Sequence, residues 1–330
     1  MGNGFDLCHG IKSSYYDFRD YLKIHYEDLV DLLEHFIDVP NLWSDFENNL
    51  GAVDLKKIVD HYVSKAKNDA MSFPLNTFEA RGAADEISRS CRYVVLLFTD
   101  FLRSYMEQWI ASLEEPGDRK LNCIDKWDRV ISFNYTKTVE TLYNVQSDQT
   151  YYIHNTPDTS LEIVGYVGWN SYLQNASPPE KGIVFGHGRG DVKPTIFTNP
   201  LPSTTYAYEM NYAHGQLENT HETLNDYFEM SGKNVDLILP ELKDYLGFPE
   251  VIDKIYIIGH SLSKVDRQYF QEIANRFGPT IEYHVTYFRE REKARIEKNV
   301  LRFLKYPGNV TYYDLSDPNN ALFETKVITS

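Results

Sequence analysis

The chain has 330 residues, a hydrophobic fraction of 42% and a formal net charge of −15 at pH 7. A chain of this length buries a sizeable core, and its ordinary apolar content disfavours intrinsic disorder. The negative charge repels phosphate backbones, so we expect no nucleic-acid partner. The densest basic run, residues 289–302, alternates Glu with Arg and Lys, which is typical of a solvated helix face.

The cysteines and the apolar stretches indicate the compartment. Cys8, Cys91 and Cys123 are odd in number and lack Cys-x-x-Cys spacing, which disfavours a disulfide framework or a zinc site. The longest apolar stretch, residues 93–98, is too short to span a bilayer, and the N-terminus has no signal-peptide pattern. We therefore expect a cytoplasmic protein with no membrane contact and no metal.

The N-terminal part of the sequence has a helical pattern of apolar residues. Residues 13–38 place apolar side chains at roughly helical spacing with charged residues between them, which predicts one long helix or two. Residues 41–116 continue this pattern and include the ambiguous apolar run at 93–98. We interpret residues 41–116 as a helical insertion or cap.

One aromatic stripe stands out in this helical region. Trp43, Phe46 and Leu50 follow one another at helical spacing, which predicts that they pack in the core. Glu47 lies beside the stripe, and we expect its carboxylate to be solvated or paired.

Beyond Gly117, short β-branched and aromatic runs alternate with helical patterns, which favours βαβ units. We therefore predict an α/β fold with a doubly wound, mostly parallel sheet of the Rossmann or sirtuin-like kind. Residues 1–40 and 117–330 would form a nucleotide-binding α/β domain. Residues 187–250 stay unassigned apart from a helix around residues 217–230. The expected strands are residues 129–133, 150–154, 182–186, 254–259 and 280–288.

The segment GNGFD at residues 2–6 has the form of a phosphate-binding glycine turn. Gly2 and Gly4 let a pyrophosphate approach the backbone, and Asp6 could accept a hydrogen bond from a ribose hydroxyl. By itself, a short glycine turn is a weak signal. Such a turn follows a buried strand, but only Met1 precedes Gly2. Because a missing central strand would cost on the order of 10 kcal/mol of burial, we expect the natural start to lie upstream, in codons for a short apolar run.

Two polar residues follow predicted strands, at the edge where parallel sheets bind ligands. Asn134 follows the strand at 129–133, although the simpler interpretation is that Asn134 or Thr136 caps the next helix. His154 closes the strand at 150–154, and a neutral imidazole there could take a proton from a ribose hydroxyl. The alternative is a strand-end histidine that only hydrogen-bonds a loop carbonyl.

More polar residues follow the later predicted strands. Ser261 fits either a ligand contact or the N-cap of a helix. Neither His187 nor His260 has a partner at metal-ligand spacing, which argues against zinc. The sequence GHSLS lacks the final glycine of a hydrolase nucleophile elbow, so a Ser-His-Asp hydrolase is a weak alternative.

Taken together and in order, these segments resemble the bacteriophage abortive infection AbiH family. The segments that carry the resemblance are GNGFDLCHGIKSSYYDF, LWSDFE, FNYTKTVETLY, IH, VFGHG and YIIGHSLSKVDRQYF, spread over most of the chain. The combination is far more specific than any single segment. The resemblance implies a role in defence against phage.

A more distant resemblance is to the sirtuin-like NAD-binding fold of antiviral NAD hydrolases. It implies that Asn134 lies near the nicotinamide ribose and that His154 serves as a base, so these two would be the catalytic residues. The chain departs from that pattern in two places, because Asn155 stands where the pattern has Gly and Gly2 lacks a preceding strand. The implied cofactor-binding residues are Gly2, Asn3, Gly4, Phe5, Asp6, Tyr135, Thr136, Gly259, His260 and Ser261.

The leading hypothesis is therefore an NAD glycohydrolase. Cleavage of the nicotinamide N-glycosidic bond passes through an oxocarbenium-like state, which requires a held ribose and a positioned water. NAD is expected as substrate or ligand, and a small nucleotide as the partner. One alternative is a non-catalytic sensor of NAD or ADP-ribose that changes its assembly state, which leaves a homo-oligomer open. A weaker alternative is a nucleic-acid-directed effector.

Overall fold

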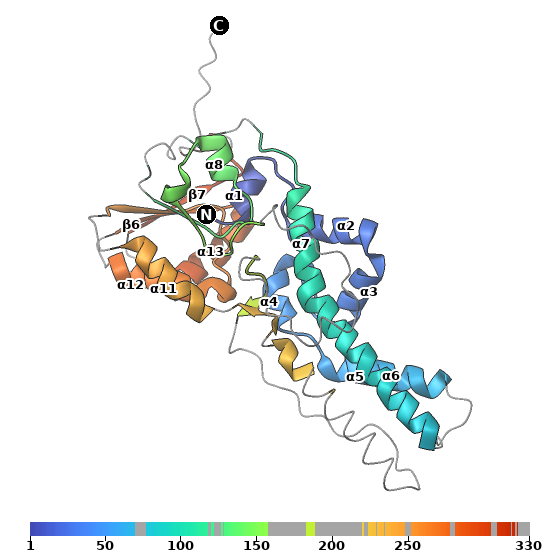
Figure 1. The fold of residues 1–330 in the computed structure, drawn as a ribbon. Coiled ribbons are helices and arrows are strands. Elements are labelled where there is room, and N and C mark those ends of the chain that lie inside the picture. Colours follow the sequence, from blue (N-terminus) through green and yellow to red (C-terminus); the bar gives the residue numbers. More distant parts are fainter. Residues whose placement is uncertain are drawn as a thin grey trace. The chain divides into compact units, whose positions relative to one another are not determined.

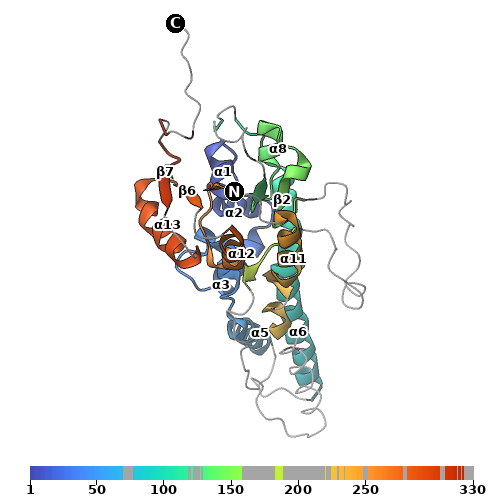
Figure 2. The same ribbon diagram turned by 90° about the vertical axis from the view of Figure 1, so that its left-hand side faces the viewer.

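The structure of the protein is a computed structural model, drawn in Figure 1 and, turned by 90°, in Figure 2. The described part is a mixed α/β protein with short parallel sheets. Cys123 and most of residues 187–250 lie outside the described residues. The structure describes residues 1–69, 77–117, 120–121, 127, 129–157, 183–188, 220, 224–228, 230–233, 235–247, 252–277, 281–304, 309–317, 319–320 and 322.

The chain divides into two compact units. Unit 1 comprises Met1–Phe18, Glu107–Val184 and Asn234–Ser330, and unit 2 comprises Arg19–Met106 and Phe185–Lys233. The division predicted from the sequence, an α/β domain with one helical insertion, stays a prediction.

The described residues of unit 1 form two parallel sheets. In the first, β1 (Val130–Ser132) pairs with β2 (Thr150–Tyr152). In the second, β6 (Glu282–Tyr287) lies between β5 (Lys254–Ile257) and β7 (Val310–Asp314). The sequence did not predict β7. The other four strands confirm the expectations at residues 129–133, 150–154, 254–259 and 280–288.

Helices connect these strands, as parallel pairing requires. α8 (Thr138–Tyr143) lies between β1 and β2, α12 (Arg267–Phe277) between β5 and β6, and α13 (Glu290–Phe303) between β6 and β7. α13 buries only its apolar stripe, which agrees with the solvated face expected at residues 289–302. The remaining elements are α1 (Asn3–Cys8), η4 (Ser147–Gln149), α11 (Val235–Leu246) and η5 (Lys264–Asp266).

Two successive residues at the end of β5 belong to two different hydrophobic clusters. Ile257 belongs to a cluster with α11, α12 and α13, whereas the next residue, Ile258, packs in a cluster with Phe5 of α1 and Val139 of α8. Since successive side chains of a strand point to opposite faces, helices cover both faces of these strands. Figure 1 shows α1 and α8 on one side of the strands and α11 to α13 on the other.

The first two residues run between the two sheets. The Met1 amino group donates to Ile131 O at 2.6 Å, and the Phe133 amide donates to Met1 O at 2.8 Å. On the other side, the Gly2 amide donates to Ile258 O at 2.9 Å. Met1 and Gly2 therefore make backbone hydrogen bonds both to the β1 segment and to the end of the β5 segment.

Unit 2 is mainly helical, and the described residues of the stretch 41–116 form helices and turns, as predicted. The ambiguous run at 93–98 ends one α-helix and begins a π-helical turn. α2 and α7 cross the boundary between the units. The elements are α2 (Tyr15–His25), α3 (Glu27–Phe36), η1 (Leu42–Ser44), α4 (Phe46–Leu50), α5 (Leu55–Asp69), α6 (Thr77–Leu96), η2 (Leu97–Phe101) and α7 (Leu102–Ala111).

The prediction of a strand at residues 182–186 is wrong. Residues 183–186 are not a strand, and the pairing begins only at β3 (His187–Gly188), which lies parallel to β4 (Gly232–Lys233). Gly186 has a φ of +142°, and a Cβ atom there would lie 1.8 Å from Ser231 O. This glycine-only conformation interrupts the apolar run that the sequence pattern suggested as a strand.

Candidate functional site

A buried polar cluster lies where β1, β2 and β5 end. Asn134 follows β1 by two residues, His154 follows β2 by two residues, and His260 follows β5 by three. Only 5% of Asn134, 2% of His154 and 5% of His260 is exposed. The carboxyl ends of parallel strands are where open α/β sheets bind ligands. The structure thus brings together Asn134 and His154, the two residues predicted to be catalytic.

The glycine turn packs tightly against the end of β5. A Cβ atom on Gly2 would lie 2.7 Å from His260 Cα, and one on Gly4 would lie 2.8 Å from Gly259 Cα. The Gly4 amide donates to Gly259 O at 2.7 Å, and Gly259 itself has a φ of +62°. The three glycines are therefore required for the close approach of two backbone segments, a role that the phosphate-binding interpretation did not anticipate.

Asp6 is a buried carboxylate of the cluster, with 1% of its surface exposed. Thr136 Oγ1 donates to Asp6 Oδ2 at 2.6 Å, and Thr136 Oγ1 also lies 3.0 Å from Thr138 Oγ1. Burial raises the pKa of Asp6 to about 6, although the neighbouring side chains of Thr136, Thr138 and Asn134 lower it. Among the described residues, Asp6 Oδ1 and Asn134 Oδ1 have no hydrogen-bond partner. An acceptor buried in this way costs about 1–3 kcal/mol, so the cluster favours a donor that comes from a ligand.

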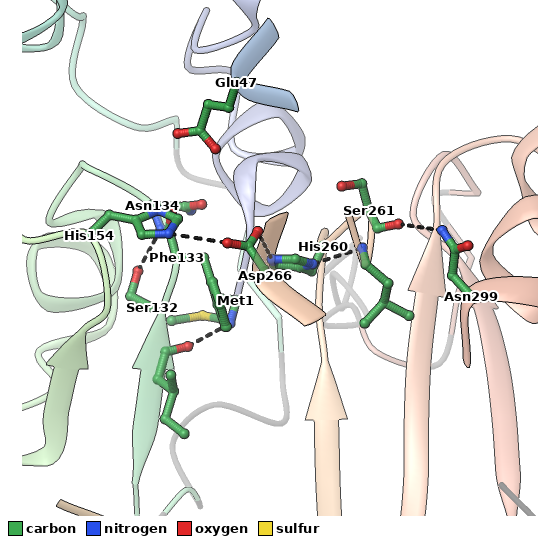
Figure 3. A network of polar contacts seen from close by, with 12 residues as sticks. Met1, Glu47, Ser132, Phe133, Asn134, His154, His260, Ser261, Asp266 and Asn299 are labelled. Carbon is green, nitrogen blue, oxygen red and sulfur yellow. Dashed lines mark hydrogen bonds and ion pairs between the residues drawn. The ribbon is translucent and has the colours of Figure 1, made fainter. Parts of the chain in front are cut away.

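Asp266 connects the two strand-end histidines, as Figure 3 shows. His154 Nε2 lies 3.3 Å from Asp266 Oδ1, and His260 Nε2 lies 3.4 Å from Asp266 Oδ2. His154 Nδ1 lies 3.0 Å from Phe133 O, so the predicted alternative, a contact with a loop carbonyl, is present as well. Burial lowers the pKa of His260, with Asp266 opposing that shift.

The turn after His260 has an unfavourable backbone conformation. Leu262 is fully buried and has a φ of +52°, which orients its amide to donate to His260 Nδ1 at 2.8 Å. A left-handed conformation costs a residue such as leucine roughly 1–2 kcal/mol. Conformations of this kind persist where the surroundings require them, and they cluster at functional sites.

The simpler capping interpretations do not hold. α8 has Lys137 at its N-cap, so neither Asn134 nor Thr136 is the cap. η5 has Ser263 at its N-cap, not Ser261. Ser261 is exposed, and its carbonyl accepts a hydrogen bond from Asn299 Nδ2 at 3.2 Å, also drawn in Figure 3.

Two other predicted site residues, Asn3 and Tyr135, form hydrogen bonds with neighbouring segments. Asn3 Oδ1 accepts a hydrogen bond from Ser13 Oγ at 2.5 Å, and Tyr135 donates to Val184 O at 3.2 Å. Asn155 has a φ of +56°, a conformation that glycine and asparagine adopt most readily. The departure from glycine at this position is therefore compatible with the same backbone turn.

His9 fixes α1 to α8, and the sequence analysis missed it. His9 Nδ1 lies 2.6 Å from Phe5 O, and His9 Nε2 lies 2.7 Å from the hydroxyl of Tyr143. The Leu121 amide donates to the same hydroxyl at 2.7 Å. The histidine of the GNGFDLCHG segment thus contacts the last tyrosine of the FNYTKTVETLY segment.

Unit 2 has a buried ion pair of its own. Lys233 Nζ lies 2.8 Å from Glu47 Oε2, and 0% and 7% of the two side chains is exposed. Tyr227 donates to Leu50 O at 2.9 Å on the same short helix, α4. Of the two expectations for Glu47, the paired carboxylate is confirmed. Trp43, Phe46 and Leu50 are buried, as predicted.

In the described part of the chain, no three His, Cys, Asp or Glu side chains are grouped so that they could hold a metal ion. None of the described helices combines the length and the apolar character needed to cross a membrane.

The fold and the site define a mixed α/β protein with buried polar groups at the ends of parallel strands. The model of the family described as bacteriophage abortive infection AbiH matches residues 1–287, and the chain belongs to that family. No curated protein and no solved structure matches the chain.

Proposed function

We propose that this AbiH protein acts in abortive infection by binding NAD at the strand-end cluster of unit 1 and cleaving its nicotinamide N-glycosidic bond. The observation that carries the proposal is the convergence of Asp6, Asn134 and Thr136 from two distant segments. Two buried acceptor oxygens in this cluster call for donors, which the hydroxyls of a ribose would supply. Loss of NAD during phage infection would then stop growth of the infected cell.

The doubly wound sheet belongs to the same proposal. The hydrogen bonds of Met1 and Gly2 to both neighbouring segments support one continuous sheet in the order β2, β1, residues 1–2, β5, β6 and β7. Helices on both faces support the same arrangement. In such a sheet, the glycine turn and Asn134 would lie at the central crevice where nucleotides bind.

The test is release of nicotinamide from NAD by the purified protein, measured by chromatography. We expect Asn134→Ala and His154→Ala to reduce the rate at least tenfold, because each removes a polar group from the cluster. His25→Ala, at an exposed histidine of α2, is the matched control and should release nicotinamide at the wild-type rate. The proposal fails if Asn134→Ala and His154→Ala hydrolyse NAD as fast as the wild type.

A non-catalytic nucleotide sensor is the second candidate. It is favoured by the surroundings of His154, whose two ring nitrogens already face Phe133 O and Asp266. A base role for His154 would require that one of these contacts opens. A rise in melting temperature with NAD or ADP-ribose, without nicotinamide release, would support the sensor.

A further inference from the structure

Asp266 lies between two histidines that come from different strand ends. Each of its carboxylate oxygens faces one ring, Oδ1 toward His154 and Oδ2 toward His260 (Figure 3). No more than 6% of any of the three side chains is exposed, so water does not screen these contacts. The protonation of each ring can be deduced from the groups that its nitrogens face.

His260 is neutral by this criterion. Its Nδ1 lies 2.8 Å from the amide nitrogen of Leu262, and an amide only donates, so Nδ1 carries no proton. Nε2 therefore carries the ring proton and directs it at Asp266 Oδ2. Burial lowers the pKa of His260 more than the neighbouring Asp266 raises it, which agrees with a neutral ring.

Both ring nitrogens of His154 face acceptors when Asp266 is ionised. Its Nδ1 lies 3.0 Å from Phe133 O, and a carbonyl oxygen only accepts. Its Nε2 faces a carboxylate oxygen of Asp266, which also accepts. A singly protonated ring would place a nitrogen lone pair against one of these oxygens.

We infer that Asp266 is a positioning residue that holds His154 in its doubly protonated, cationic form and His260 in its neutral Nε2–H form. A buried cation is stable only with a close counter-charge and satisfied hydrogen bonds, and Asp266 and Phe133 O provide both. The inference goes beyond the proposed function, because it concerns the charge of the cluster and holds whether or not NAD is the ligand.

The test is a long-range ¹H–¹⁵N spectrum of the ¹⁵N-labelled full-length protein at pH 7. Spectra of His154→Gln and His260→Gln assign the two rings. We expect the cationic pattern for His154, with both nitrogens protonated, and the Nε2–H pattern for His260. A neutral His154 in the wild-type spectrum would overturn the inference, and this result needs no variant of Asp266.

Variants of Asp266 separate positioning from a merely structural role. We expect Asp266→Asn to abolish the cationic pattern of His154, because an amide does not compensate the charge of the ring. Asp266→Glu should restore it, and Asp253→Asn, at an exposed aspartate before β5, should leave it unchanged. A folded Asp266→Asn protein that retains the cationic pattern would contradict the inference.

Discussion

Glu47 of unit 2 and Asp6 of unit 1 are both buried carboxylates, and they are satisfied in different ways. In unit 2, Lys233 and Glu47 form a close ion pair. In unit 1, Asp6 has one oxygen hydrogen-bonded by Thr136 and one without a partner among the described residues, and burial raises its pKa to about 6. A paired buried charge is compatible with a structural role alone, whereas the unsatisfied buried oxygens at the strand ends support the ligand site proposed above.

The largest expected change in stability comes from breaking the ion pair between Lys233 and Glu47 in unit 2. Lys233→Met leaves the Glu47 carboxylate buried without its counter-charge, which should lower the free energy of unfolding by about 3–5 kcal/mol. The measurement is urea unfolding followed by circular dichroism. If the ion pair is the cause, the double variant Glu47→Leu/Lys233→Met should recover most of the loss, since no charge is then buried. A loss below about 1 kcal/mol in the single variant would contradict this account of unit 2.

The next effect concerns the pH dependence that Asp6 imparts to unit 1. Its folded pKa of about 6 is above its ordinary value of 3.8, so the folded state binds the proton more tightly than the unfolded state. The contribution of Asp6 to the free energy of unfolding is therefore fully present below about pH 4 and is lost as the pH rises through 6. The total loss is about 3 kcal/mol.

Asp6→Asn removes this titration. We expect its free energy of unfolding to fall less than that of the wild type between pH 4 and pH 7.5, and the two proteins to differ most in slope near pH 5. Urea unfolding at a series of pH values measures both slopes. Equal slopes would mean that Asp6 does not titrate in this range.

A smaller effect tests whether backbone packing supports the site. Gly4→Ala places a Cβ atom 2.8 Å from the Gly259 backbone, which cannot move aside as a flexible side chain could, so we expect a loss of about 1–3 kcal/mol. Gly82→Ala is the matched control, because Gly82 is an exposed residue of α6 with no atom near its added Cβ. That change should stabilise the helix by about 1 kcal/mol. Equal melting temperatures for the two variants would contradict the close approach at Gly4.

Local patterns in the sequence predicted much of the fold. The strands β1, β2, β5 and β6 were recognisable because each is an apolar run that ends in small or polar residues. β7 was missed because Val310–Asp314 lacks a continuous apolar run: Thr311, Tyr312 and Tyr313 at its centre carry hydroxyl groups. The run at 182–186 misled because its described residues form no strand, although the Val184 amide donates to His154 O at 2.8 Å. The run also ends at Gly186, whose φ only glycine adopts readily.

The site was predictable in part for a similar reason. Asn134, His154 and His260 were found because each follows a strand, and Asp6 because it belongs to a glycine turn. Asp266 was missed because its role depends on a turn after β5 that brings the chain back toward the strand ends. No residue spacing in the sequence indicates that turn. Lys233 was missed because its partner, Glu47, lies 186 residues away.

The most direct test of the central claim is calorimetric titration of NAD into the full-length protein. Wild type and His25→Ala should bind NAD with the same affinity, whereas Asn134→Ala should bind at least tenfold more weakly, because it removes an acceptor of the strand-end cluster. Equal affinity of all three proteins for NAD, or no binding by the wild type, would contradict the assignment of this cluster as the nucleotide site.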